Sequence, residues 1–118
     1  MQKNSSSYEE GDIVILELPF TNMVGKKLRP VVVLSSSELN LVSADLIVAK
    51  ISSSEHLPDF EIKITSSDVK EGKLKKTSYI HCHSIFTVEK NLILKKAGKL
   101  KPEKLIEVKN IIRKVFNI

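Results

Sequence analysis

The 118-residue sequence has few of the residues that cross-link chains, span membranes or stack on bases. Its single cysteine, Cys82, excludes a disulfide within one chain, and so little cysteine is typical of reducing compartments. No apolar run approaches the roughly 20 residues that cross a bilayer, and the polar first residues lack the apolar segment of a signal peptide. We therefore expect a cytoplasmic protein with no membrane contact. Aromatic residues make up 5%, which excludes an extended stacking platform for nucleic acid.

Arginine is also scarce, because lysine supplies nearly all of the positive charge. Only Arg29 and Arg113 occur among 19 basic residues. Arg29 lies between two apolar, strand-like runs, in the segment Lys27-Leu28-Arg29-Pro30. A guanidinium group can bind two oxygens of one phosphate and keeps its proton at any ordinary pH. The position of Arg29 therefore predicts oxyanion recognition.

The net charge of +5 is unevenly distributed. The first 60 residues contain five basic and eight acidic residues, whereas the remaining 58 contain fourteen basic and six acidic residues. Such a basic half attracts phosphate polyanions, although a merely solvated lysine-rich face remains an equal alternative. We expect the acids before the first strand, Glu9, Glu10 and Asp12, to serve solvation. The basic residues form two groups, which are Lys70, Lys73, Lys75 and Lys76, and then Lys95, Lys96, Lys99, Lys101 and Lys104.

The composition, 42% hydrophobic and 28% charged, indicates one globular domain, which we expect over residues 11–118 after a flexible tail at 1–10. Pro102 suits a first helical position, and a closing amphipathic helix is predicted after it. The fold class is therefore mainly β, a small bent sheet or barrel with one C-terminal helix. Strands are predicted at residues 13–18, 30–34, 46–51, 60–64 and 78–85, with polar loops at 21–28 and 66–77, and the helix repeats Leu105, Val108, Ile112 and Val115.

A series of short motifs begins at Gly11. The motifs are Gly11-Asp12, Pro19-Phe20-Thr21, Lys27-Leu28-Arg29-Pro30 and Val31-Val32-Val33-Leu34-Ser35. This series resembles the MazF/PemK toxins of type II toxin–antitoxin systems, in the CcdB/PemK superfamily, and a weaker similarity continues into the final helix. The resemblance implies a small Src-homology-3-like β-barrel with a C-terminal helix. It also implies a homodimer that cleaves single-stranded RNA, including mRNA, without metal and is neutralised by an antitoxin.

The resemblance also implies site residues. Arg29 matches the family's arginine at the cut site, where it would stabilise the phosphorane, and Ser52 matches a Thr or Ser that binds the phosphate. Lys27, Ser53 and Ser54 adjoin these two positions and are candidate substrate contacts, as are Lys75 and Lys76 in the basic half. The segment 51–54 alone would be an ordinary polar loop. Its pairing with Arg29 favours a role in cleavage that leaves 2′,3′-cyclic phosphate and 5′-hydroxyl ends.

Two histidines stand where some relatives carry an acidic base. Many relatives have Glu before the Arg-Pro pair, whereas this chain has Gly25, Lys26 and Lys27. His83 matches the acidic position in the fifth strand, and strand alternation places His81 on the same face. Because histidine titrates near neutral pH, we expect His83 to transfer protons beside His81. The alternative, two strand histidines without a role, stays open.

A metal centre is the other chemistry that His81-x-His83 suggests, with His56 or Cys82 as a further ligand. Cys82 is expected to point to the opposite face, and the sequence suggests no nearby carboxylate or second cysteine to complete three or four ligands. We therefore expect neither a metal nor another cofactor.

Two functions besides the ribonuclease remain open. One is a non-catalytic relative that poisons gyrase by binding it, and the other is an RNA-binding barrel with salt-dependent affinity. The Lys-x-Arg-Pro motif favours the ribonuclease. A basic cleft of this kind predicts an acidic, partly disordered antitoxin segment that covers Arg29. The loops 21–28 and 66–77 are predicted to set the recognised sequence.

Overall fold

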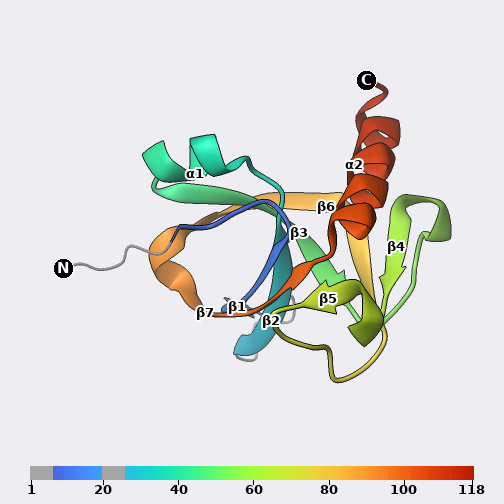
Figure 1. The fold of residues 1–118 in the computed structure, drawn as a ribbon, viewed down its shortest axis with the longest axis horizontal. Helices are drawn as coiled ribbons and strands as arrows, with labels where there is room; N and C mark the ends of the chain where they lie inside the picture. Colours follow the sequence, from blue (N-terminus) through green and yellow to red (C-terminus); the bar gives the residue numbers. More distant parts are fainter. Residues whose placement is uncertain (1–6, 20–25) are drawn as a thin grey trace.

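A computed structural model describes residues 7–19 and 26–118. Within these residues one antiparallel sheet has the strand order β4-β6-β3-β2-β1-β7-β5. Figure 1 shows the sheet curling into a nearly closed barrel with a helix at one side. The predicted small β-barrel with a C-terminal helix is therefore confirmed. The strands are β1 (Asp12–Pro19), β2 (Lys26–Val33), β3 (Asp45–Ser52), β4 (Glu61–Ile64), β5 (Val69–Lys70), β6 (Ser78–Glu89) and β7 (Ile93–Leu100).

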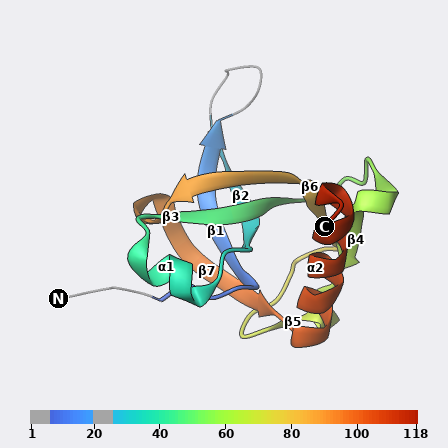
Figure 2. The ribbon, with the colours of Figure 1, turned by 90° about the horizontal axis from the view of Figure 1, so that it is seen from above.

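The C-terminal helix α2 (Pro102–Phe116) begins with Pro102 in its first turn, as predicted. Its buried Val108 and the partly buried Ile112 and Val115 pack against the core, and the helix lies beside β4 and the start of β6 (Figure 2). Neither α-helix in the described residues is long and apolar enough to span a membrane. The remaining helical segments are α1 (Ser37–Val42) and the 3-10 turns η1 (Pro58–Phe60), η2 (Ser66–Asp68) and η3 (Lys90–Leu92).

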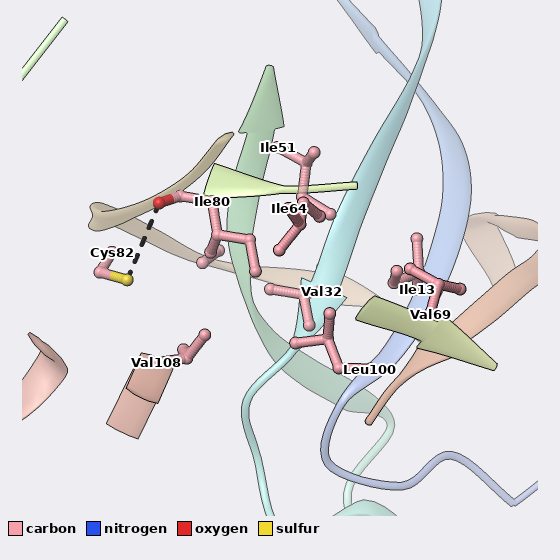
Figure 3. Packing of buried hydrophobic residues seen from close by; sticks show 10 residues of the cluster. Ile13, Val32, Ile51, Ile64, Val69, Ile80, Cys82, Leu100 and Val108 are labelled. Carbon is pink, nitrogen blue, oxygen red and sulfur yellow. Dashed lines mark hydrogen bonds between the residues drawn. The ribbon is translucent and has the colours of Figure 1, made fainter. Parts of the chain in front are cut away.

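Two apolar clusters lie on opposite faces of β1, β2 and β3. Successive residues such as Ile13 and Val14 enter different clusters because side chains alternate along a strand. Burial on both faces explains the near-continuous apolar runs of these strands. The helix cluster, drawn in Figure 3, contains Ile13, Val32, Ala49, Ile51, Ile64, Val69, Ile80, Cys82, Leu100 and Val108. The distal cluster contains Val14, Leu16, Val31, Val33, Leu46, Val48 and Val88.

Several element bounds differ from the prediction. β2 begins at Lys26, so Arg29 lies within the strand and not at its start, because residues 26–30 pair with β1. β6 continues to Glu89. Neither β5 nor the lysine-rich β7 was expected. The rest of the predicted loop 21–28, which includes Thr21 and Gly25, lies outside the described residues together with Phe20.

Part of the expected N-terminal tail packs against the barrel. Tyr8 lies against the distal cluster, and the Asn40 Nδ2 group donates a hydrogen bond of 2.9 Å to the Tyr8 carbonyl oxygen. The Lys96 ammonium group lies 5.3 Å from the centre of the Tyr8 ring, at cation–π distance. Residues 1–6 of the expected tail lie outside the described residues.

The acids that follow Tyr8 form ion pairs, so the expectation that they serve only solvation is wrong. Glu9 and the buried Asp12 both contact the Lys99 ammonium group, and Glu10 lies 3.0 Å from Lys109 of α2. Burial acts to lower the pKa of Lys99, but the hydrogen bonds that its ammonium group donates to Glu9 and Asp12 outweigh it and raise the pKa. These pairs fasten the start of β1 to β7 and α2.

Candidate functional site

One row of cross-strand partners runs through four strands of the sheet. Val31 of β2 pairs with Lys50 of β3, Lys50 pairs with His81 of β6, and His81 pairs with Glu61 of β4. Partners opposite one another in antiparallel strands point to the same face. The side chains of Lys50, His81 and Glu61 therefore share the face that Val31 buries in the distal cluster.

Arg29 and Ser52 extend this face by one further row. Each lies two residues beyond the Val31–Lys50 pair, and the antiparallel direction places both at the same end of β2 and β3. Alternation then gives Arg29 and Ser52 the same orientation as that pair. The structure thus places the two residues expected to bind the phosphate on neighbouring strands, on one face.

A hydrogen-bonded path connects Ser52 to His81. The Ser54 backbone N–H donates to the Ser52 Oγ atom over 3.1 Å, and the His81 Nε2 atom lies 3.0 Å from the Ser54 carbonyl oxygen. Because a carbonyl oxygen can only accept, Nε2 carries the hydrogen. Among the described residues the Ser52 hydroxyl donates no hydrogen bond, so its own hydrogen can be donated to a substrate. Ser53, which lies between Ser52 and Ser54 in the sequence, is exposed.

Glu61 corrects the expectation that no carboxylate lies near the histidines. Its side chain is 0% exposed, and its Oε2 atom lies 3.7 Å from the His81 Nδ1 atom. The backbone N–H groups of His56 and Leu57 donate to the carboxylate over 3.1 and 2.9 Å. Burial acts to raise the pKa of Glu61, but these hydrogen bonds and the nearby imidazoles outweigh it and lower the pKa. The carboxylate is therefore ionised at neutral pH.

A bulge in β6 positions His83. Ala49 pairs with Ile85, whereas the next residue, Lys50, pairs with His81, so the three β6 residues between Ile85 and His81 have no partner on β3. The exposed His83 ring stacks on the buried His81 ring, with the ring centres 5.6 Å apart and the planes at 19°. The two imidazoles therefore lie side by side, one inside the protein and one open to solvent.

Cys82 belongs to the helix cluster (Figure 3), and strand alternation places its side chain on the face opposite to His81 and His83. Burial, with a smaller contribution from the Glu61 charge, raises the pKa of its thiol to about 12. The thiol is therefore protonated and shielded from solvent, and it is not available to the histidine site.

The site face carries further residues that the sequence did not single out. Tyr79 pairs with Ser52 and with Lys63 of β4, so both side chains lie on the face of Arg29. Together with Lys27 and Lys50 they surround the site with positive charge and one aromatic ring. Within the part of the chain that the structure describes, no carboxylate lies within ion-pair distance of Lys27, Arg29, Lys50 or Lys63.

Lys75 and Lys76 lie on a different surface. They border a pocket of about 570 Å³ whose floor includes Ile15 and Pro30. Ile15 pairs with Pro30, and both point away from the face that carries Arg29. We call this space the lysine pocket; its lining is Ile13, Ile15, Leu28, Pro30, Lys73, Leu74, Lys75, Lys76, Ser78, Lys95, Lys96 and Ala97.

Gly72 allows the loop beside the lysine pocket to lie against β7. A Cβ atom at Gly72, which has φ +156°, would lie 2.0 Å from the Ala97 carbonyl oxygen. Replacing Gly72 by alanine should therefore lower the free energy of unfolding by about 1–3 kcal/mol, because backbone must move. Urea denaturation measures the change. Lys73→Ala, at the exposed neighbouring position, should stay within about 0.5 kcal/mol of the wild type, and equal losses in the two variants would contradict the close approach.

Comparison with known proteins decides the family. Residues 9–116 match the model of the PemK-like, MazF-like toxins of type II toxin–antitoxin systems. The chain belongs to this family. The resemblance predicted from Gly11 onward is therefore confirmed, and the match covers every strand and all of α2.

Solved structures share the fold of this PemK/MazF-like toxin. An endoribonuclease in complex with its cognate antitoxin from a mycobacterial species superposes with a TM-score of 0.78 at 14% identity, covering 94% of this chain and 96% of that one. The MazE–MazF structure from Deinococcus radiodurans gives 0.77 at 18% identity, covering 96% and 99%. Toxin MazF-mt6 of Mycobacterium tuberculosis gives 0.70 at 17%, covering 89% and 97%. No curated protein matches this toxin in sequence.

Proposed function

We propose that this toxin is a metal-independent, sequence-selective endoribonuclease that cleaves single-stranded RNA in the cytoplasm and is neutralised by a cognate antitoxin. The observation that carries the proposal is the shared face of Arg29 and Ser52, connected through Ser54 to the paired imidazoles. One guanidinium, one free hydroxyl hydrogen and one solvent-exposed imidazole are the groups that such a cleavage needs.

Arg29 and Ser52 act on the phosphate. Attack by the ribose 2′-oxygen places additional negative charge on the non-bridging oxygens of the phosphorane, which the guanidinium of Arg29 stabilises by charge-assisted hydrogen bonds. The Ser52 hydroxyl donates its hydrogen to one of the same oxygens, because an ionised phosphate oxygen can only accept, while Oγ accepts the Ser54 N–H. The two residues thereby hold the phosphate in position for in-line displacement.

His83 carries a proton during the same step. The bond between the 2′-oxygen and phosphorus forms while the bond to the 5′-oxygen breaks, so one proton leaves the 2′-hydroxyl and one reaches the 5′-oxygen. Of the two imidazoles only that of His83 is exposed, and it is the group placed to exchange one of these protons. The products are a 2′,3′-cyclic phosphate and a 5′-hydroxyl. His81 supports the ring of His83 by stacking.

Basic residues on two surfaces hold the RNA and attract the antitoxin. Lys27, Lys50 and Lys63 surround the site, and Ser53 and Ser54 offer polar contacts at its edge. Lys75 and Lys76 bind a more distant part of the strand, across β2 at the lysine pocket. An acidic, partly disordered antitoxin segment would cover Arg29 by the same electrostatic attraction. The toxin acts as a homodimer.

The test is incubation of the full chain with a long single-stranded RNA in excess EDTA, followed by mapping of the fragment ends. We expect discrete fragments that survive the chelator and carry 2′,3′-cyclic phosphate and 5′-hydroxyl ends. A fully double-stranded RNA of the same sequence, the matched control, should stay intact. If the RNA is bound but not cut, the protein is a non-catalytic RNA-binding barrel and this proposal is wrong. If the RNA is not bound, the result favours a toxin that acts on a protein such as gyrase.

A further inference from the structure

We propose that Glu61, His81 and His83 form a binding site for a first-row divalent transition-metal ion of the Zn²⁺ type. We further infer that an ion bound there inhibits RNA cleavage because it occupies His83. The binding site stands on its own geometry, whereas the inhibition rests on the proposed function.

The three side chains provide a suitable ligand set. One ligand atom from each, two imidazole nitrogens and a carboxylate oxygen, lie within 4.8 Å of one another. Two histidines and one glutamate with a remaining open position are a common ligand set for Zn²⁺. Glu61 and His81 are held by strand pairing, whereas the exposed His83 can move the short distance that closes the site. Mg²⁺ and Ca²⁺ prefer oxygen ligands and should bind weakly.

The polar atoms of the buried pair His81–Glu61 face one another. The His81 Nε2 hydrogen points at the Ser54 carbonyl, so in the neutral ring the Nδ1 lone pair faces the Glu61 carboxylate 3.7 Å away. The His81 and Glu61 side chains are only 3% and 0% exposed, so both ligand atoms are held away from bulk solvent. An ion between them would be bound by both atoms.

The surroundings of the ligands match those of metal sites. A metal-binding histidine usually donates its other N–H to a carbonyl or carboxylate, and a ligating carboxylate is itself hydrogen-bonded. Here His81 donates to Ser54, and Glu61 accepts from the backbone of His56 and Leu57. These bonds fix both inner ligands before any ion arrives. The exposed His83 leaves the path from solvent open.

The chain also contains a matched control. The exposed His56 ring lies 5.6 Å from the His81 ring, at an edge-to-face angle of 79°, but it is not part of the three-ligand group. His56→Ala therefore removes a neighbouring histidine without removing a proposed ligand. A nonspecific histidine patch would lose affinity with either His56 or His83.

Titration of the full chain with Zn²⁺ against a chromogenic chelator tests the site, and Co²⁺ absorption reports the ligand geometry. We expect one ion per chain, no competition from Mg²⁺, and at least about tenfold weaker binding in His83→Ala and Glu61→Gln. His56→Ala should bind like the wild type. Circular dichroism verifies folding of each variant, and His83→Ala, at an exposed position, remains informative if Glu61→Gln unfolds. Absence of saturable binding, or equal affinity in His83→Ala and wild type, would overturn the proposal.

The inhibition is measured separately, by titrating Zn²⁺ into the cleavage reaction and then adding EDTA. We expect cleavage to stop as the site fills and to return with EDTA, and Glu61→Gln to need at least about ten times more Zn²⁺ for half-inhibition. Zinc that binds without slowing cleavage would overturn the inhibition. A toxin that never cleaves RNA would instead remove the proposed function, while the binding titration would still decide the metal site.

Discussion

Replacing Arg29 by alanine should slow RNA cleavage by about 10²–10³-fold, the usual effect of removing one donor that stabilises developing negative charge. Arg29 lies on the same face as Ser52. No other guanidinium in the described residues can replace it, because Arg113 lies on the exposed side of α2. Single-turnover cleavage of a defined oligonucleotide measures the rate.

Two further variants separate geometry from charge. Arg113→Ala removes the same unit charge from the exposed side of α2 and should leave the rate within about twofold of the wild type, since a surface charge acts mainly through screened, long-range attraction. Arg29→Lys keeps the charge but loses the two-pronged contact, so it should recover only part of the rate. A rate for Arg29→Ala close to that of Arg113→Ala would exclude Arg29 from the phosphate site.

Leu16→Ala should lower the free energy of unfolding by about 2–5 kcal/mol. Leu16 is 0% exposed in the distal cluster, and it pairs directly with Arg29 across β1 and β2. Its truncation leaves a cavity in the distal cluster, next to the strand that carries the guanidinium. Equilibrium unfolding in urea, followed by circular dichroism, measures the loss.

Leu16→Met is the matched control, because it nearly conserves volume and should cost less than about 1.5 kcal/mol. We also expect Leu16→Ala to slow cleavage under conditions where the variant is still folded, since Arg29 loses packing against its cross-strand partner. Equal unfolding midpoints for the alanine and methionine variants would mean that the distal cluster tolerates the cavity by collapsing around it.

The sequence predicts the parts of this fold whose local pattern and burial agree. β1 and β3 are apolar on both faces, and the helix after Pro102 has a proline start and a repeating apolar stripe, so each could be recognised alone. β7 could not be recognised from the sequence, because its lysines obscure the apolar pattern of a strand. Its buried residues, such as Gly98 and Leu100, lie mainly near its end. β5 has two residues, too few for any pattern.

Some residues of the candidate site were likewise singled out from the sequence, and others were not. Arg29 was singled out from the Lys-x-Arg-Pro motif and Ser52 from the family resemblance, and their role in cleavage stays a prediction. Glu61 could not, because its position beside His81 depends on the pairing of β4 with β6 and on a bulge that local patterns do not reveal. The alternation of residues 60–64 does place Glu61 on a definite face, but only tertiary pairing shows that the face is buried. The separation of Lys75 and Lys76 from Arg29 likewise follows from strand register.

The bulge in β6 divides this strand into two parts that pair independently. Before it, β6 pairs with β4 and the end of β3; after it, the same strand completes the barrel through Val88. The two halves keep separate registers. Substitution of His83 or Ser84, which lie within the bulge, therefore changes the side chains at this position without changing the pairing of β6 with β3 or β4. Substitutions there should therefore cost little folding free energy.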